Sequence, residues 1–129
     1  MSEEFQPGQT VTGLYKTGKY IGELISQNRA GTHFVVKVLA VIKHPTQGDL
    51  HSPKSVDVPL FHERRALSFS EKTNIPQTYL KPFDGDIPEY GESLKHALEE
   101  QKRELQELDN DWANKSIETL ETLEKDYFK

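Results

Sequence analysis

The sequence predicts a mainly β fold with a helical appendage, in which a small β-barrel is followed by a helical hairpin. Short β-rich runs separated by glycine, proline and asparagine fill the first two thirds of the 129 residues. Helical periodicity and an excess of acidic residues then replace this pattern near residue 88. We therefore expect a barrel over residues 5–87 and an acidic helical region over residues 88–129.

The expected strands follow one another between turn signals. Residues 11–15 and 20–25 flank a glycine-containing turn and are typical of a β-hairpin. The longest apolar run, residues 32–43, is rich in β-branched side chains, and its length suggests a strand that bends to serve two sheets. Shorter candidates follow at residues 56–61, 65–70 and 78–81. A closed barrel is favoured over an open sheet because closure leaves no long edge unpaired.

The last third contains two apolar stripes at helical spacing. The first follows Pro88 and consists of Leu94, Leu98, Leu105 and Leu108. The second consists of Trp112, Ile117, Leu120, Leu123 and Tyr127. Residues 109–111, Asp-Asn-Asp, combine poor helix propensity with good N-cap chemistry and predict a break there. One unbroken helix would extend about 60 Å, so two antiparallel helices are favoured over a single long one.

Composition and charge exclude several classes of protein. The net charge is −5, divided into +1 for residues 1–87 and −6 for residues 88–129. There is no basic stripe of the kind that binds a phosphate backbone, so nucleic acid is not an expected partner. No apolar run approaches the length of a membrane span, and the first residues lack a signal-peptide pattern. The chain contains no cysteine that could be acylated or form a disulfide. We expect a cytoplasmic protein without a lipid anchor.

Candidate chemistry is sparse, and we assign no catalytic residue, no cofactor and no metal site. His44, Asp49, His51 and His62 are suitable zinc ligands by type, but their spacing matches no compact ligand pattern. Ser52 beside His51 and His62 lacks the glycines of a nucleophile elbow. The protein is therefore not expected to be an enzyme. A metal-binding protein that uses these histidines stays an alternative.

Aromatic side chains are the better candidates for binding a partner. Residues 75–80, Ile-Pro-Gln-Thr-Tyr-Leu, resemble the closing segment of SH3 domains, so the expected barrel is SH3-like. In such a barrel, Tyr15, Tyr20, Pro76 and Tyr79 would form a shelf for an extended peptide. Trp112, Tyr127 and Phe128 would provide anchors on the helical region. The alternative is that these side chains only pack the core.

Three longer strings carry a resemblance to a known family. Residues 15–23 (YKTGKYIGE), 41–51 (VIKHPTQGDLH) and 58–67 (VPLFHERRAL) resemble the kinase-associated lipoprotein B family of spore-forming Bacillus-type bacteria. The resemblance continues through Pro76, residues 81–83 and the acidic helical end. It implies an SH3-like barrel with a C-terminal helical extension. It also implies a role in activating or expressing a membrane sensor histidine kinase that feeds the sporulation phosphorelay.

We therefore expect a non-enzymatic accessory protein of two-component signalling whose partner is a sensor histidine kinase. The kinase would recruit it to the inner face of the membrane, without direct insertion. The sequence leaves open the binding surface, the oligomeric state, and the choice between an effect on kinase activity and one on kinase expression. An SH3-like module that binds nucleic acid or the ribosome stays an alternative of a different class.

Overall fold

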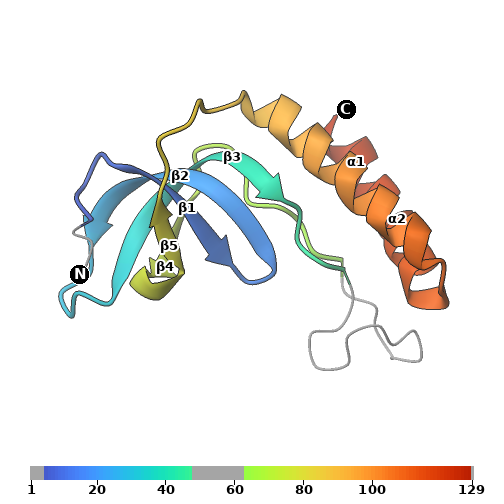
Figure 1. Cartoon of the computed structure of the whole chain (residues 1–129), viewed down its shortest axis with the longest axis horizontal. Helices are drawn as coiled ribbons and strands as arrows, with labels where there is room; N and C mark the ends of the chain where they lie inside the picture. The colour runs from blue at the N-terminus through green and yellow to red at the C-terminus, as the bar shows by residue number, and fades with distance from the viewer. Residues whose placement is uncertain (1–4, 48–62, 129) are drawn as a thin grey trace.

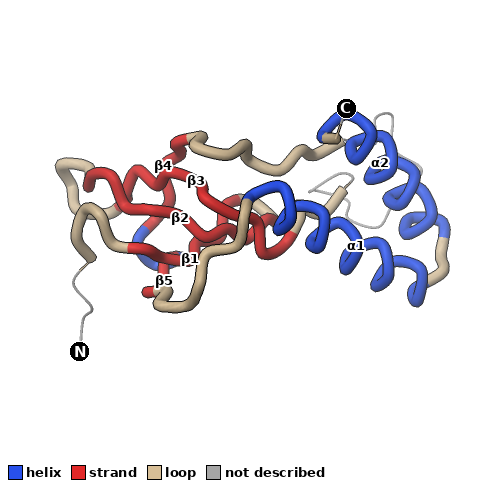
Figure 2. The backbone as a smooth tube through the Cα atoms, turned by 90° about the horizontal axis from the view of Figure 1, so that it is seen from above, coloured by secondary structure: helices blue, strands red, loops and turns tan. Residues whose placement is uncertain are grey.

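The computed structural model describes residues 5–47 and 63–128. Within these residues, five strands form one antiparallel sheet in the order β4-β3-β2-β1-β5, and two helices follow the sheet. The strands are β1 (Thr10–Tyr15), β2 (Gly18–Gln27), β3 (His33–Lys43), β4 (Lys72–Pro76) and β5 (Leu80–Pro82), and the helices are α1 (Tyr90–Leu108) and α2 (Asp111–Tyr127). Figures 1 and 2 show the helices side by side at one end of the sheet. The expected mainly β fold with C-terminal helices is confirmed.

The central strands β2 and β3 pair closely because of a glycine. A Cβ atom on Gly22 would collide with Val36 Cγ1 and would lie 2.8 Å from the carbonyl oxygen of Lys37. The β2–β3 register shifts between Ile21 and Gly22, and irregularities of this kind bend a strand. Only glycine therefore allows the two strands to approach at this position.

The closed SH3-like barrel that we expected is not confirmed. In the described part of the chain, β4 pairs with β3 and β5 pairs with β1, but no ladder joins β4 to β5. The turn Gln77–Tyr79, a short 3₁₀ helix, connects these two edge strands. The sheet therefore stays open between them.

One of the shorter strand predictions is wrong, one is displaced along the chain, and one lies outside the described residues. Residues 65–70 form an extended loop and a turn, because much of their backbone hydrogen bonding goes to side chains. The strand expected at residues 78–81 begins only at Leu80, and β4 occupies a segment that we did not expect to be a strand. The candidate at residues 56–61 lies outside the part of the chain that the structure describes.

The two helices are separated by a sharp reversal at the position that the sequence indicates. Asp109 has a left-handed conformation (φ 44°) and ends α1. Asn110 caps α2, because its side chain accepts a hydrogen bond of 2.7 Å from the backbone N–H of Ala113. The helices therefore run antiparallel rather than as one long helix (Figure 1).

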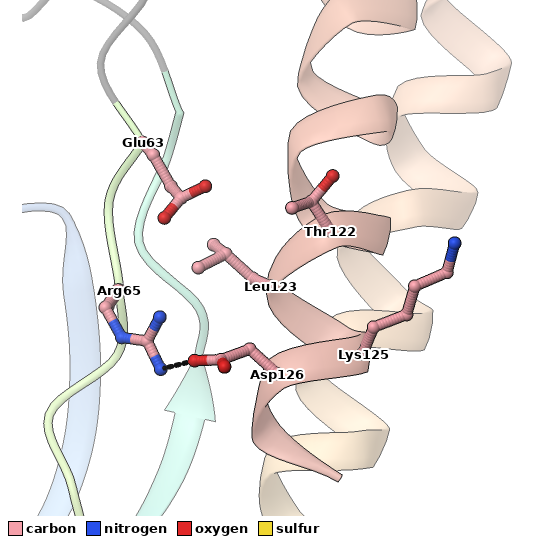
Figure 3. Close-up of a pocket in the computed structure, with 6 residues that line it drawn as sticks. All are labelled: Glu63, Arg65, Thr122, Leu123, Lys125 and Asp126. Carbon is pink, nitrogen blue, oxygen red and sulfur yellow. Dashed lines mark hydrogen bonds and ion pairs between the residues drawn. The ribbon is translucent and has the colours of Figure 1, made fainter. Parts of the chain in front are cut away.

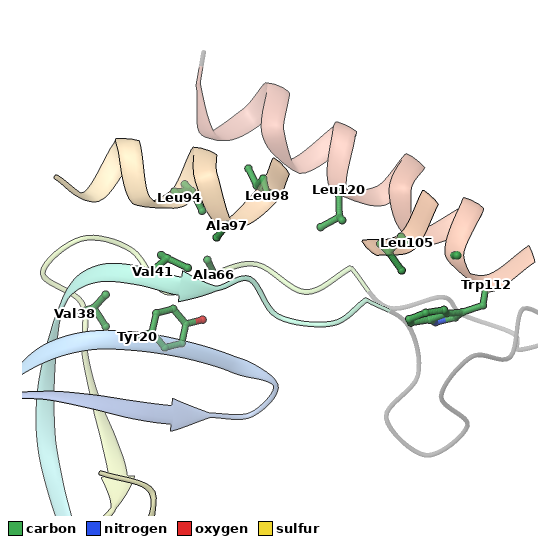
Figure 4. Close-up of a cluster of buried hydrophobic side chains, with 11 residues drawn as sticks. Tyr20, Val38, Val41, Ala66, Leu94, Ala97, Leu98, Leu105, Trp112 and Leu120 are labelled. Carbon is green, nitrogen blue, oxygen red and sulfur yellow. The ribbon is translucent and has the colours of Figure 1, made fainter. Parts of the chain in front are cut away.

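One hydrophobic cluster joins the sheet to both helices (Figure 4). The sheet contributes Tyr20, Val38 and Val41, and the loop after the undescribed residues contributes Ala66. The helices contribute Leu94, Ala97, Leu98 and Leu105 from α1 and Trp112, Ala113 and Leu120 from α2. A smaller cluster lies within the sheet and includes Val11, Leu24, Phe34, Val36, Ile75 and Leu80. Because the helices share a core with the sheet, removing them would expose apolar side chains of the sheet. The division into two domains at residue 88 stays a prediction.

Candidate functional site

The sheet and both helices meet at residues 64–67, which we call the strap. Three tyrosine hydroxyls bind its backbone, and each comes from a different element. The hydroxyl of Tyr127 in α2 accepts from the N–H of Ala66 (2.9 Å), and that of Tyr20 in β2 accepts from the N–H of Leu67 (3.2 Å). The hydroxyl of Tyr90 in α1 donates to the carbonyl of Leu67 (2.5 Å). The strap therefore fixes the helices against the sheet.

Side chains also bind the beginning of the strap. Gln47, which is buried, donates from Nε2 to the carbonyl of Arg64 (2.9 Å) and accepts at Oε1 from its N–H (2.8 Å). Arg65 forms an ion pair with Asp126 and lies 5.1 Å from the centre of the Tyr127 ring. The paired backbone groups explain why an irregular segment can cross the junction without a strand partner.

His44 is buried at the same junction. Its Nδ1 lies 3.0 Å from the carbonyl of Pro45, and because a carbonyl can only accept, Nδ1 carries the proton. Its Nε2 then accepts from the hydroxyl of Tyr127 at 3.0 Å. The main effect on its titration is burial, which lowers the pKa of His44 to about 4. His44 is therefore neutral near pH 7, with both nitrogens engaged.

The tyrosines of the junction are held in the protonated form. Burial raises the pKa of Tyr20 to about 12, and it also raises the pKa of Tyr90 and of Tyr127. Near neutral pH each hydroxyl is available as both donor and acceptor. This network is suited to holding the helices in place, because none of its groups titrates near neutral pH.

The surface beside the strap forms an open depression that Figure 3 shows in close-up. Glu63, Arg65, Lys125 and Asp126 bring two negative and two positive charges to it, and Thr122 and Leu123 complete its lining. Arg65 and Asp126 point toward each other and pair (Figure 3). The depression therefore has nearly balanced charge and no nucleophile activated by a base.

The structure places the predicted partner-binding residues at very different depths. Tyr20 (2% exposed) and Trp112 (7%) are buried, Tyr15, Pro76 and Tyr127 are partly buried, and Tyr79 (53%) and Phe128 (45%) are exposed. No ring contact in the described part of the chain joins Tyr15, Tyr20 and Tyr79. The hydroxyl of Tyr20 binds the strap, and Tyr15 and Tyr20 line one depression beside it, whereas Pro76 and Tyr79 are not among its lining residues. A role for these aromatics in binding a partner stays a prediction.

The sequence does not reveal the strap, and it offers His44 only as a residue suitable by type for zinc, to which we assign no metal site. His44 was a candidate metal ligand, but both of its ring nitrogens are engaged in this structure. Asp49, His51, Ser52 and His62 lie outside the described residues, so the structure does not test the candidate zinc ligands or the candidate hydrolytic set as a group. Among residues 5–47 and 63–128, no group of three His, Asp or Glu side chains could hold a metal ion. No local signal in the sequence reveals hydrogen bonds that join residues so far apart.

Comparison with known proteins identifies the family. The family model described as "Kinase associated protein B" matches residues 15–128. The chain belongs to the kinase-associated protein B family. Kinase-associated lipoprotein B of Bacillus subtilis (strain 168) is 50% identical over 124 residues, which cover 96% of this chain and 95% of the relative. The resemblance inferred from the three sequence strings is confirmed.

A solved member of the family has the same fold. The crystal structure of kinase-associated protein B from Bacillus cereus superimposes with a TM-score of 0.81 at 47% identity. The match covers 98% of this chain and 100% of that one. In the described residues of the present family member, no helix has the length and apolar character needed to cross a membrane.

Proposed function

We propose that this protein is a non-enzymatic accessory protein that binds a sensor histidine kinase of the sporulation phosphorelay and supports its activation or expression. Membership of the kinase-associated protein B family carries the proposal. The balanced charges of the surface depression and the fully engaged His44 also favour binding over catalysis. The protein acts in the cytoplasm, and the kinase recruits it to the inner face of the membrane.

The exposed surface of the helices supports docking to a protein with a basic surface. Between residues 88 and 128, ten acidic side chains are exposed, against four basic ones. The acidic ones are Glu89, Glu92, Glu99, Glu104, Glu107, Asp109, Asp111, Glu118, Glu121 and Asp126, and the basic ones are Lys95, Arg103, Lys115 and Lys125. Such an excess attracts and orients a positively charged partner, and it repels a phosphate backbone. It therefore favours a protein partner over the nucleic-acid alternative.

The sheet itself supports a finer structural proposal. The strand order β4-β3-β2-β1-β5, with a 3₁₀ turn between the two edge strands, is what an SH3-like barrel with an unpaired seam would have. We propose that this is its architecture. Peptide binding by the sheet is not part of the proposed function, because the expected aromatic shelf includes a buried tyrosine.

Co-purification with the kinase tests the proposed function. The tagged full-length chain is expressed with the sporulation sensor kinase, with and without the membrane part of the kinase. We expect the kinase to be captured in both cases, and capture to weaken as salt is raised. Failure to capture either form above the level of an untagged control would refute the proposal. A mobility shift with RNA or DNA at low salt would instead support the nucleic-acid alternative.

Charge reversals test whether the acidic helices dock the kinase. The double variant Glu107→Lys/Glu118→Lys changes two exposed helical side chains without touching the shared core. Its matched control is Asp84→Lys/Asp86→Lys, with the same charge change in the exposed segment before α1. We expect capture to fall several-fold for the helical variant and to stay within twofold of the unmodified chain for the control. Equal capture by both would exclude the helical surface as the docking element.

A further inference from the structure

A groove runs between α1 and the segment formed by the end of β3 and the residues after it. Its outer part extends along Ile42 and Glu100, and its inner part reaches Trp112 and Ser116 of α2. Both parts are lined by Lys43, Gln101 and Glu104, so they are continuous. The inner part has a volume of about 120 Å³, which suits one side chain rather than a whole small-molecule ligand.

Two polar atoms in the inner part of the groove lack partners. Gln101 Oε1 and Ser116 Oγ are buried, and neither has a hydrogen-bond partner among the described residues. Ser116 is only 1% exposed. Gln101 already donates from Nε2 to the carbonyl of His44 at 2.9 Å, which leaves Oε1 as an acceptor. Because an unsatisfied buried polar atom is costly, the inner part favours a ligand that donates hydrogen bonds.

The walls of the groove define the rest of this ligand. Leu105 and Trp112 give the inner part an apolar wall. Both belong to the hydrophobic cluster drawn in Figure 4. Leu108, which is 51% exposed, lies at the rim of this part, and Ile42, which is 40% exposed, lines the outer part. Glu104 has no ion-pair partner in the described part of the chain, whereas Glu100 pairs with Arg103. A long cationic side chain with an apolar neighbour matches this combination, since its alkyl stem packs on apolar walls while its head donates hydrogen bonds.

We propose that this groove is the docking site for the kinase, an inference that rests on the proposed function. The partner is a kinase segment in which an arginine or lysine stands beside an aliphatic residue. The basic side chain enters the inner part, where its stem lies along Leu105 and Trp112. Its head donates to Gln101 Oε1 and Ser116 Oγ. The aliphatic neighbour covers Leu108 at the rim.

The only tryptophan of the chain lines the inner part and provides a direct reporter. The full-length chain is titrated with overlapping 15-residue peptides that span the cytoplasmic part of the kinase, and Trp112 emission is followed. We expect the emission to change only with peptides that contain an arginine or lysine beside a leucine, isoleucine or valine. Replacing that basic residue by glutamine should weaken binding at least tenfold. No response from any peptide, or an undiminished response after this replacement, would overturn the proposal.

Variants of the groove test the same inference with the intact kinase. Ser116→Ala removes an unpartnered hydroxyl, so we expect unchanged or higher stability together with weaker capture, a combination that a purely structural role would not produce. Glu104→Lys should reduce capture about tenfold. Its matched control is Asp84→Lys, exposed in the segment before α1 and outside both the groove and the acidic helical surface, which should leave capture within twofold.

The outcomes separate the groove from the proposed function. If the unmodified chain captures the kinase and both Ser116→Ala and Glu104→Lys capture it equally well, the groove is excluded while kinase binding stands. If the unmodified chain captures no kinase, the proposed function fails, and the groove proposal fails with it.

Discussion

Replacing Tyr127 by phenylalanine removes only the hydroxyl group, but it should destabilise the protein strongly. The hydroxyl donates to Nε2 of His44 and accepts from the N–H of Ala66. Phenylalanine keeps the ring, which packs edge-on against the His44 ring at 5.9 Å between centroids. The variant therefore isolates the hydroxyl. Each polar group left without a partner in the interior costs about 1–3 kcal/mol.

We expect the free energy of unfolding to fall by about 2–4 kcal/mol, since two groups lose their partner but Tyr127 is only partly buried. That is a large share of the stability of a small domain, which is about 5–15 kcal/mol. Urea unfolding at pH 7, followed by circular dichroism, measures the change. Tyr79→Phe is the matched control, because Tyr79 is 53% exposed, and it should change stability by less than about 0.5 kcal/mol. A loss for Tyr127→Phe no larger than that of the control would refute the role of this hydroxyl.

Three further predictions concern stability. The pKa of His44 is about 4 in the folded chain against an ordinary value of 6.5, so the unfolded chain binds a proton first as the pH decreases. The contribution of His44 to the free energy of unfolding is therefore fully present above about pH 6.5 and falls by about 3 kcal/mol as the pH decreases to 4. His44→Gln should flatten the unfolding free energy between about pH 6.5 and 4.5, and an unchanged slope would contradict this assignment. Gly22→Ala should lower the melting temperature more than Gly13→Ala. The Cβ added at position 22 meets a backbone oxygen at 2.8 Å, whereas the Cβ added at position 13 meets only the ends of flexible side chains. The reverse order in thermal melts would be inconsistent with the β2–β3 contact. Ser93→Ala should cost about 1–3 kcal/mol in urea unfolding, because Ser93 Oγ accepts from the buried N–H of Val41 at 3.0 Å, whereas no measurable loss would mean that water replaces the hydroxyl.

The elements that could be predicted from the sequence are those with a strong local pattern. The two strands of the first hairpin and the long third strand have β-branched periodicity, and the helix break has its own capping residue, Asn110. β4 contains Lys72, Thr73 and Asn74, and it is a strand because β3 offers it an edge, which no short window of sequence reveals. The strap could not be predicted for the same reason, since its hydroxyl partners stand 23 to 61 residues away.

The candidate site was predictable only in part. The acidic character of the helices follows directly from the sequence, and so does the presence of aromatic anchors. Whether an aromatic side chain faces outward depends on tertiary packing, which places Tyr20 and Trp112 inside and leaves Tyr79 and Phe128 at the surface. The groove beside α1 forms only because the residues after β3 pack near the helices, so it also depends on tertiary packing.

The open seam of the sheet affects how the protein behaves at high concentration. An unpaired strand edge can recruit a strand from another molecule, and flat, long edges do so most readily. Here β5 has three residues and β4 has five; each ends in a proline, and Lys72 and Lys81 are exposed on them. Proline removes a backbone donor, and an approaching second sheet would have to bury the lysine charges, which opposes its approach. Both edge strands thus discourage fibre-like association, even though no ladder joins them within residues 5–47 and 63–128.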